Sequence, residues 1–125
     1  MKIDGAAIGQ FSEAQLGTGV ELEANAKTPQ YQQALKVAML NKDRNERAYK
    51  KVRDLYGQLK GKRGAIAKLE GEKAPNLDEK KQEFAKWHAD MKAQVADLLE
   101  EARKMEDEIY KVNQPQPHRY EVGRL

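Results

Sequence analysis

The chain has 125 residues, of which 39% are apolar, 34% are charged and only 6% are aromatic, with a net charge of +3. This length suits about one domain, and the scarcity of large apolar side chains disfavours a thick globular core. The absence of cysteine excludes disulfides and thiolate metal sites. No apolar run has the length of a signal peptide or a membrane span, so we expect a cytoplasmic protein without membrane contact.

Residues 1–27 contain four glycines and scattered apolar residues without sustained periodicity. A segment of this kind predicts an extended N-terminal arm. Within it, Ser12 and Gln15 have the spacing of a capping box, which favours one short helical turn.

The pair Thr28-Pro29 predicts the start of a long helix over 29–73, because threonine caps helices well and proline suits the first helical position. The apolar stripe of this helix is weak over 41–47, where every residue is polar. Glycines near its end leave two interpretations open. The helix breaks or kinks over 57–64, or the glycine spacing gives one smooth helical face that bulky side chains can approach.

The sequence Ala74-Pro75-Asn76 predicts a turn over 74–76 and an N-cap for a second helix over 77–113. Six apolar residues in this helix are spaced seven apart, which defines a heptad seam. The seam residues are Leu77, Phe84, Met91, Leu98, Met105 and Val112. After the seam, two prolines open segment 114–125 and predict an extended C-terminal tail.

Charge predicts how the two helices pair. If the chain folds back at the turn, residues whose numbers add to about 148 lie opposite one another, since short connections join antiparallel helices. The acidic stretch 97–108 then faces the basic stretch 40–51, and such a match selects orientation more than it stabilises. The sequence therefore predicts an all-α fold: a long antiparallel, coiled-coil-like helical hairpin over 28–113, with extended arms at both ends.

The same pairing places Phe84 and Trp87 opposite Gly64 and Gly61. Because glycine has no side chain, the large aromatic side chains can fill the space beside it. We expect the hairpin seam to be built from apolar residues of both helices. These are Val52, Leu55, Leu59, Ile66 and Leu69 from the first helix, and Leu77, Phe84, Met91, Val95, Leu98, Ala102, Met105, Ile109 and Val112 from the second.

No residue constellation in the chain predicts catalysis. His88 falls on the seam and has no metal-ligand spacing to a second histidine, and His118 follows a proline without a partner motif. The carboxylates form no recognisable dyad in a pocket, and no phosphate-binding loop is present. We therefore expect no enzyme activity, no catalytic residues, no cofactor and no metal site.

Two groups of residues are candidates for binding partners. Near the predicted hairpin tip, two aromatic residues and four basic ones form a candidate protein-binding cluster: Phe84, Trp87, Lys60, Lys62, Arg63 and Lys68. Further back, basic residues of the first helix are candidates for contact with nucleic-acid phosphates: Lys42, Arg44, Arg47, Lys50, Lys51 and Arg53.

A two-helix hairpin buries only one stripe per helix, which is marginal for an isolated chain. We therefore expect a homo-oligomer or a subunit of a larger assembly. The hypothesis that best fits this layout is a non-enzymatic structural or assembly protein whose arms lace onto neighbours, as in the head interior, neck or tail of a phage virion. A small coiled-coil chaperone of a secretion system and a nucleic-acid-associated protein are the alternatives.

Overall fold

The computed structural model describes residues 1–124 and is mostly helical, at 69%. Its elements are β1 (Lys2–Ile3), β2 (Ala6–Ala7), α1 (Glu13–Thr18), α2 (Pro29–Arg44), a π-helical turn η1 (Asn45–Tyr49), α3 (Lys50–Gly71), α4 (Leu77–Val112) and β3 (Tyr120–Glu121). These elements form two compact units. The helical unit comprises residues 41–107, and the terminal unit comprises residues 1–40 with 108–124.

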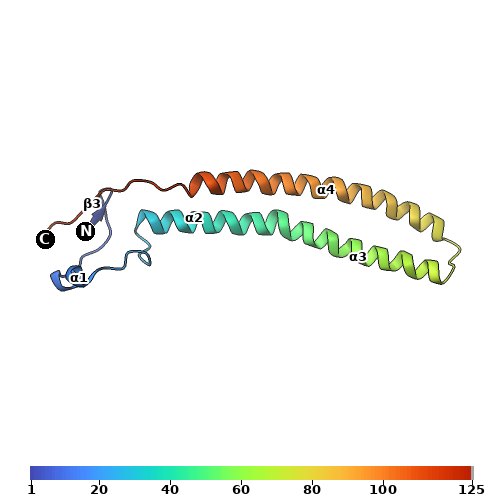
Figure 1. Ribbon diagram of the computed structural model, residues 1–125, viewed down its shortest axis with the longest axis horizontal. Coiled ribbons are helices and arrows are strands. Elements are labelled where there is room, and N and C mark those ends of the chain that lie inside the picture. The colour runs from blue at the N-terminus through green and yellow to red at the C-terminus, as the bar shows by residue number, and fades with distance from the viewer. Residues whose placement is uncertain (125) are drawn as a thin grey trace. The chain divides into compact units, whose positions relative to one another are not determined.

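In the helical unit, α3 and α4 run side by side in opposite directions on either side of one short turn (Figure 1). Leu59 of α3 packs against Met91 and Val95 of α4, and all three side chains are buried. Four half-buried apolar residues surround this cluster: Val52, Leu55, Phe84 and Trp87. The core of this unit is therefore a narrow strip between two helices, as the low apolar content implied.

Ion pairs between the helices fix their relative direction. Arg44 reaches Glu106 at 3.0 Å and Arg47 reaches Glu101 at 2.8 Å, so the basic and acidic stretches do face each other. At the turn end, Lys81 pairs with Glu70. The Glu70 carboxylate raises the pKa of Lys81, because it stabilises the protonated amine through a hydrogen bond and its charge.

The glycine-containing part of the first long helix is continuous. α3 runs as regular α-helix from Lys50 to Gly71 without a break over 57–64, because burial of Leu59 on the opposite face offsets the helix cost of the glycines. The irregular turn is η1, which overlaps the polar run over 41–47 and buries only Ala48.

The predicted contact between aromatic residues and glycines is wrong. A Cβ atom built at Gly61 or Gly64 would meet nothing within 4 Å, so these glycines point away from α4. Phe84 and Trp87 pack instead on the Leu59 cluster. The physical reason is helical periodicity, since the glycines lie on the face opposite the apolar stripe that α4 covers.

Every residue of the predicted seam is buried or half-buried. The most deeply buried stretch is on α4, where Met91, Val95, Leu98 and Ala102 are each at most 8% exposed. Ala48 in η1 is fully buried as well, although it was not among the predicted seam residues. Packing is therefore tightest around the middle of α4 and looser toward the turn.

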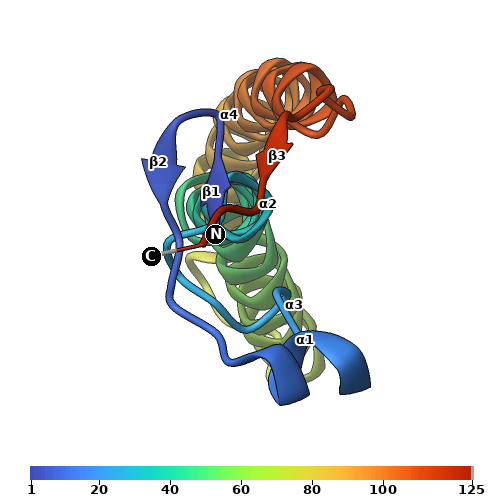
Figure 2. The ribbon, with the colours of Figure 1, turned by 90° about the vertical axis from the view of Figure 1, so that its left-hand side faces the viewer.

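The terminal unit contains a small antiparallel sheet in the order β2-β1-β3 (Figure 2). Lys2 lies opposite Ala7 on one side and opposite Glu121 on the other, so the N-terminal and C-terminal segments pair with each other. The extended arms that the sequence predicts are not confirmed, and the fold is not purely helical. Within the predicted tail, residues 120–121 form the strand β3, which pairs with β1 of the same chain.

Local chemistry explains why these terminal segments are ordered. Ser12 and Gln15 form the predicted capping box at the start of α1. Thr28 is fully buried, and its hydroxyl accepts from the Tyr31 N–H at 3.2 Å, which caps α2 as predicted. Ile3 and Ile8 are also buried, which gives this unit a small apolar centre of its own.

Candidate protein-binding groove

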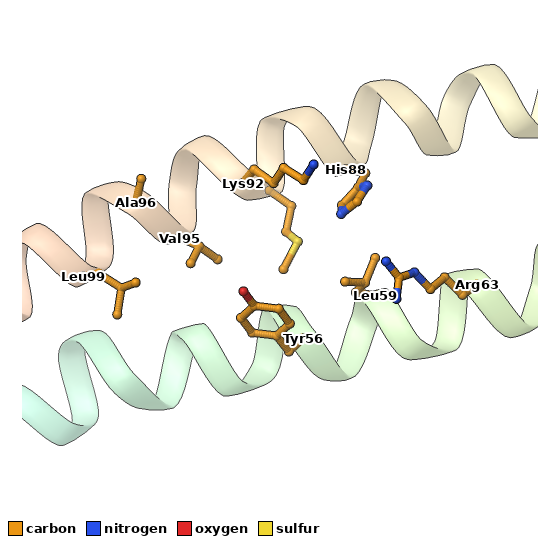
Figure 3. Close-up of a pocket in the computed structure, with 9 residues that line it drawn as sticks. Tyr56, Leu59, Arg63, His88, Lys92, Val95, Ala96 and Leu99 are labelled. Carbon is orange, nitrogen blue, oxygen red and sulfur yellow. The ribbon is translucent and has the colours of Figure 1, made fainter.

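The helical unit carries an open groove between α3 and α4, with a volume of about 520 Å³ (Figure 3). Tyr56 and Leu59 point into it from α3, and Val95 and Leu99 point into it from α4. The complete lining is Tyr56, Leu59, Arg63, His88, Met91, Lys92, Val95, Ala96 and Leu99. Because the two helices cover only one side of each other, the edge of their apolar strip remains open here.

Two large apolar side chains on the groove are exposed to solvent. Tyr56 is 54% exposed and Leu99 is 44% exposed, although both adjoin the buried Leu59 cluster. An exposed apolar surface that continues a hydrophobic core is typical of a surface that binds a partner. The groove therefore leaves apolar surface open beside the core.

The charged side chains of the groove, Arg63 and Lys92, are both cations. Arg63, His88 and Lys92 are among its lining residues, and the lining includes no carboxylate. His88 is half-buried and stacks on Phe84 with ring centroids 5.6 Å apart, so packing holds its ring in place. The arrangement suits a partner that presents apolar groups with a negative charge nearby, and it offers no carboxylate for acid–base work with the histidine.

Three residues of the predicted protein-binding cluster come together. Phe84 and Trp87 stack with centroids 6.2 Å apart, and the Lys62 amine lies 4.9 Å from the Trp87 ring centroid. Lys62 and Phe84 also line a second, smaller hollow of about 160 Å³. Trp87 is half-buried under this lysine, so it contributes to the core more than it presents a free surface.

The other three residues of that cluster are separate. Arg63 lines the large groove, Lys68 pairs with Glu72 on its own helix, and Lys60 is exposed. The tip therefore has no single basic patch, because successive residues of α3 point in different directions.

Half of the candidate nucleic-acid residues are engaged in ion pairs. Lys42 pairs with Glu46, while Arg44 and Arg47 pair with carboxylates of α4. Arg44 also lies over the Tyr49 ring, 5.6 Å from its centroid, and its Nε atom is buried without a hydrogen-bond partner within residues 1–124. Arg44 and Arg47 therefore join the two helices, and Lys42 is paired locally, so few free cations remain here to contact phosphates.

Lys50, Lys51 and Arg53 are exposed, and none forms an ion pair within the part of the chain that the structure describes. In particular, neither lysine pairs with Asp97. Three cations on an exposed helical face are common on any soluble helix, so this group alone does not indicate a nucleic-acid site.

In the terminal unit, Asp4 holds the two ends of the chain together. Its carboxylate accepts from the backbone N–H of Arg119 at 2.8 Å and lies 2.7 Å from Nδ1 of His118. These contacts lower the pKa of Asp4, mainly through the backbone hydrogen bond and next through the histidine. His118, which the sequence left without a partner, therefore has a structural one.

Sequence reasoning missed the exposed half of the groove. Tyr56, Lys92 and Leu99 were not singled out, because apolar and charged residues one step beyond a heptad seam usually belong to the solvated face. The signal available was spacing, since Lys92 and Leu99 each follow a seam residue directly and are themselves seven apart.

Comparison with protein-family models, with curated proteins and with solved structures finds no match to this chain. Among the residues that the structure describes, no group of three or more histidines or carboxylates is placed to hold a metal ion. None of the helices within 1–124 combines the length and apolar character needed to cross a membrane.

Proposed function

We propose that this chain is a non-enzymatic structural or assembly protein whose helical unit binds other protein subunits. The observation that carries this proposal is the groove beside the core, where Tyr56 and Leu99 stay largely exposed next to buried Leu59. Exposed apolar side chains that continue a buried cluster form the kind of surface that a partner covers in many assemblies.

The small size of the core supports the same conclusion. The buried apolar residues of the helical unit are Ala48, Leu59, Met91, Val95, Leu98 and Ala102, and two of these are alanines. A helix pair with so few large buried side chains gains much of its stability by association with further helices.

A finer part of the proposal is that α3 and α4 pack as an antiparallel coiled coil. Met91, Val95, Leu98 and Ala102 follow one another at intervals of four, three and four residues, and all are buried. This alternation is the spacing of a coiled-coil seam. We further propose a multi-subunit particle such as a phage virion as the setting, because a helix pair with a core this small is suited to packing among other subunits.

The test is the molar mass of the full chain in solution, measured by light scattering over a wide range of protein concentration. We expect a mass above that of one chain, increasing with concentration as sites fill. Far-ultraviolet circular dichroism on the same samples checks that the helices are formed. A well-folded monomer at every concentration would refute the proposal that the helical unit requires partners.

A further inference from the structure

A stripe on α4, which begins at the groove residues Lys92 and Leu99 and continues past the groove to Glu106, has a pattern that is complementary to itself. Lys92, Leu99 and Glu106 are spaced seven residues apart, which is about two helical turns and roughly 10 Å per step. Each directly follows a seam residue, Met91, Leu98 or Met105, so the three form one stripe beside the buried seam. In a coiled coil, this flanking position carries the charges that select the partner.

Along the stripe, the cation Lys92 comes first, the apolar Leu99 lies at the centre, and the anion Glu106 comes last. If a second copy of α4 lies antiparallel across this stripe, Leu99 meets Leu99 on the two-fold axis. Lys92 of each copy then meets Glu106 of the other, because both lie seven residues from the axis. A surface that matches itself under a two-fold rotation is the requirement for a symmetric dimer.

The side chains of this stripe are available for such contacts. Lys92 is exposed and forms no ion pair within residues 1–124. Leu99 is 44% exposed. Glu106 bonds Arg44 through Oε1 at 3.0 Å, and its Oε2 accepts no hydrogen bond from the described residues. One carboxylate can accept from two cations, so the intramolecular pair leaves room for a second one.

The geometry points to this groove face as the surface on which a second copy of the chain docks antiparallel, with Leu99 on the two-fold axis and two Lys92–Glu106 ion pairs between the copies. Small Ala96 in the same wall lets the helices approach closely. The docking also covers Tyr56, on the other wall of the groove. This inference rests on the proposed assembly function, and it identifies a second copy of the same chain as the partner.

The decisive experiment uses charge exchange in the full chain, measured by light scattering. Lys92→Glu places a carboxylate opposite Glu106 at both contacts of the dimer. We expect the dissociation constant of the dimer to rise by about tenfold or more. Glu106→Lys creates the opposite repulsion and should weaken dimers similarly. Mixing the two variants places opposite charges together at both contacts, so we expect the mixture to recover association that neither variant shows alone.

Lys86→Glu is the matched control, because it makes the same charge change at an exposed position on α4 away from the groove. We expect it to leave dimerisation unchanged. Glu106→Lys also removes the bond to Arg44, so circular dichroism must show that the helices of this variant are intact. The Lys92→Glu measurement does not depend on that variant.

A second measurement locates the axis directly. The chain has no cysteine, so Leu99→Cys provides a single thiol, and a short bismaleimide should link two copies at high yield. Lys104→Cys, exposed on the same helix but outside the groove, should link poorly. Linking at Lys104→Cys but not at Leu99→Cys would overturn the proposed face.

The outcomes separate this inference from the proposed function. If the wild-type chain self-associates while Lys92→Glu has no effect and Leu99→Cys does not link, another surface joins the copies and only this inference fails. If the wild-type chain stays monomeric, both proposals fail. If association is recovered when the two charge variants are mixed, and Leu99→Cys links two copies, the antiparallel dimer is supported. These two results would contradict the alternative that a different protein alone occupies the groove.

Discussion

Leu59→Ala tests whether the groove is open to solvent in the folded chain. Leu59 is 7% exposed and packs against Met91 and Val95, so its side chain belongs to the core. The substitution removes three carbon atoms, which at about 0.8 kcal/mol per buried carbon corresponds to roughly 2 kcal/mol of lost transfer free energy.

The cavity left behind normally adds a second contribution to the loss of unfolding free energy. For a fully enclosed leucine, it raises the total loss on substitution by alanine to about 3–5 kcal/mol. Leu59 lines the groove, so the vacated space joins a hollow that is already open to the surface. The cavity contribution should therefore be small, and we expect a total loss of about 2 kcal/mol, a large fraction of the stability of a small unit.

Urea denaturation monitored by circular dichroism measures this loss, with the slope of unfolding free energy against urea checked for constancy. The matched control is Gln58→Ala, an exposed neighbour on the same helix, for which we expect a change within about 0.5 kcal/mol. A loss no larger than that of the control would show that Leu59 is not a core residue. A loss of about 4 kcal/mol or more would show that the site is enclosed and that the groove is absent.

Three further predictions concern the helix, the ion pairs and the chain ends. Gly61→Ala should stabilise the chain by about 0.5–1 kcal/mol in thermal unfolding, because a Cβ there meets nothing within 4 Å; destabilisation would instead indicate an aromatic side chain against this glycine. A double-mutant cycle on Arg44 and Glu106, with alanine at each, should give a coupling of about 1 kcal/mol, since the arginine side chain is only 19% exposed; additive changes would refute a close pair. The lowered pKa of Asp4 predicts a stabilising contribution that is complete above the ordinary carboxyl pKa and lost as pH falls through the lowered value. Nuclear magnetic resonance titration of the Asp4 carboxyl measures this pKa, and Asp4→Asn should remove this part of the pH dependence of stability. An ordinary pKa would contradict the hydrogen bond from the Arg119 backbone N–H and the contact with His118.

Much of the helical architecture follows from local sequence signals. Thr28-Pro29 marks the start of α2 and the turn before Leu77 marks the start of α4, as the structure has them. Caps and prolines act through the first few residues of a helix, so they can be recognised without knowledge of the fold. The direction of the helix pair was also predictable, because long opposite-charge stretches tolerate errors of a few residues in register.

The details of register were less predictable. Arg47 pairs with Glu101 in the expected register, and Arg44 pairs with Glu106 two residues from it. Lys50 and Lys51, however, do not pair with Asp97 within the described residues. Side-chain direction around each helix decides which charges meet, and that direction depends on the phase set by η1. The net charge of a stretch does not reveal how its residues are rotated around the helix axis after η1.

The sequence by itself determined that the chain forms two long helices with a heptad seam on the second, because apolar periodicity and helix caps are local properties. Only the tertiary structure decided which seam neighbours stay exposed, since Tyr56 and Leu99 border a groove that exists only when α3 and α4 are packed. It also decided that residues near the two chain ends pair through Asp4, a contact between residues more than a hundred positions apart. Contacts of such separation depend on the path of the whole chain, which no local pattern records.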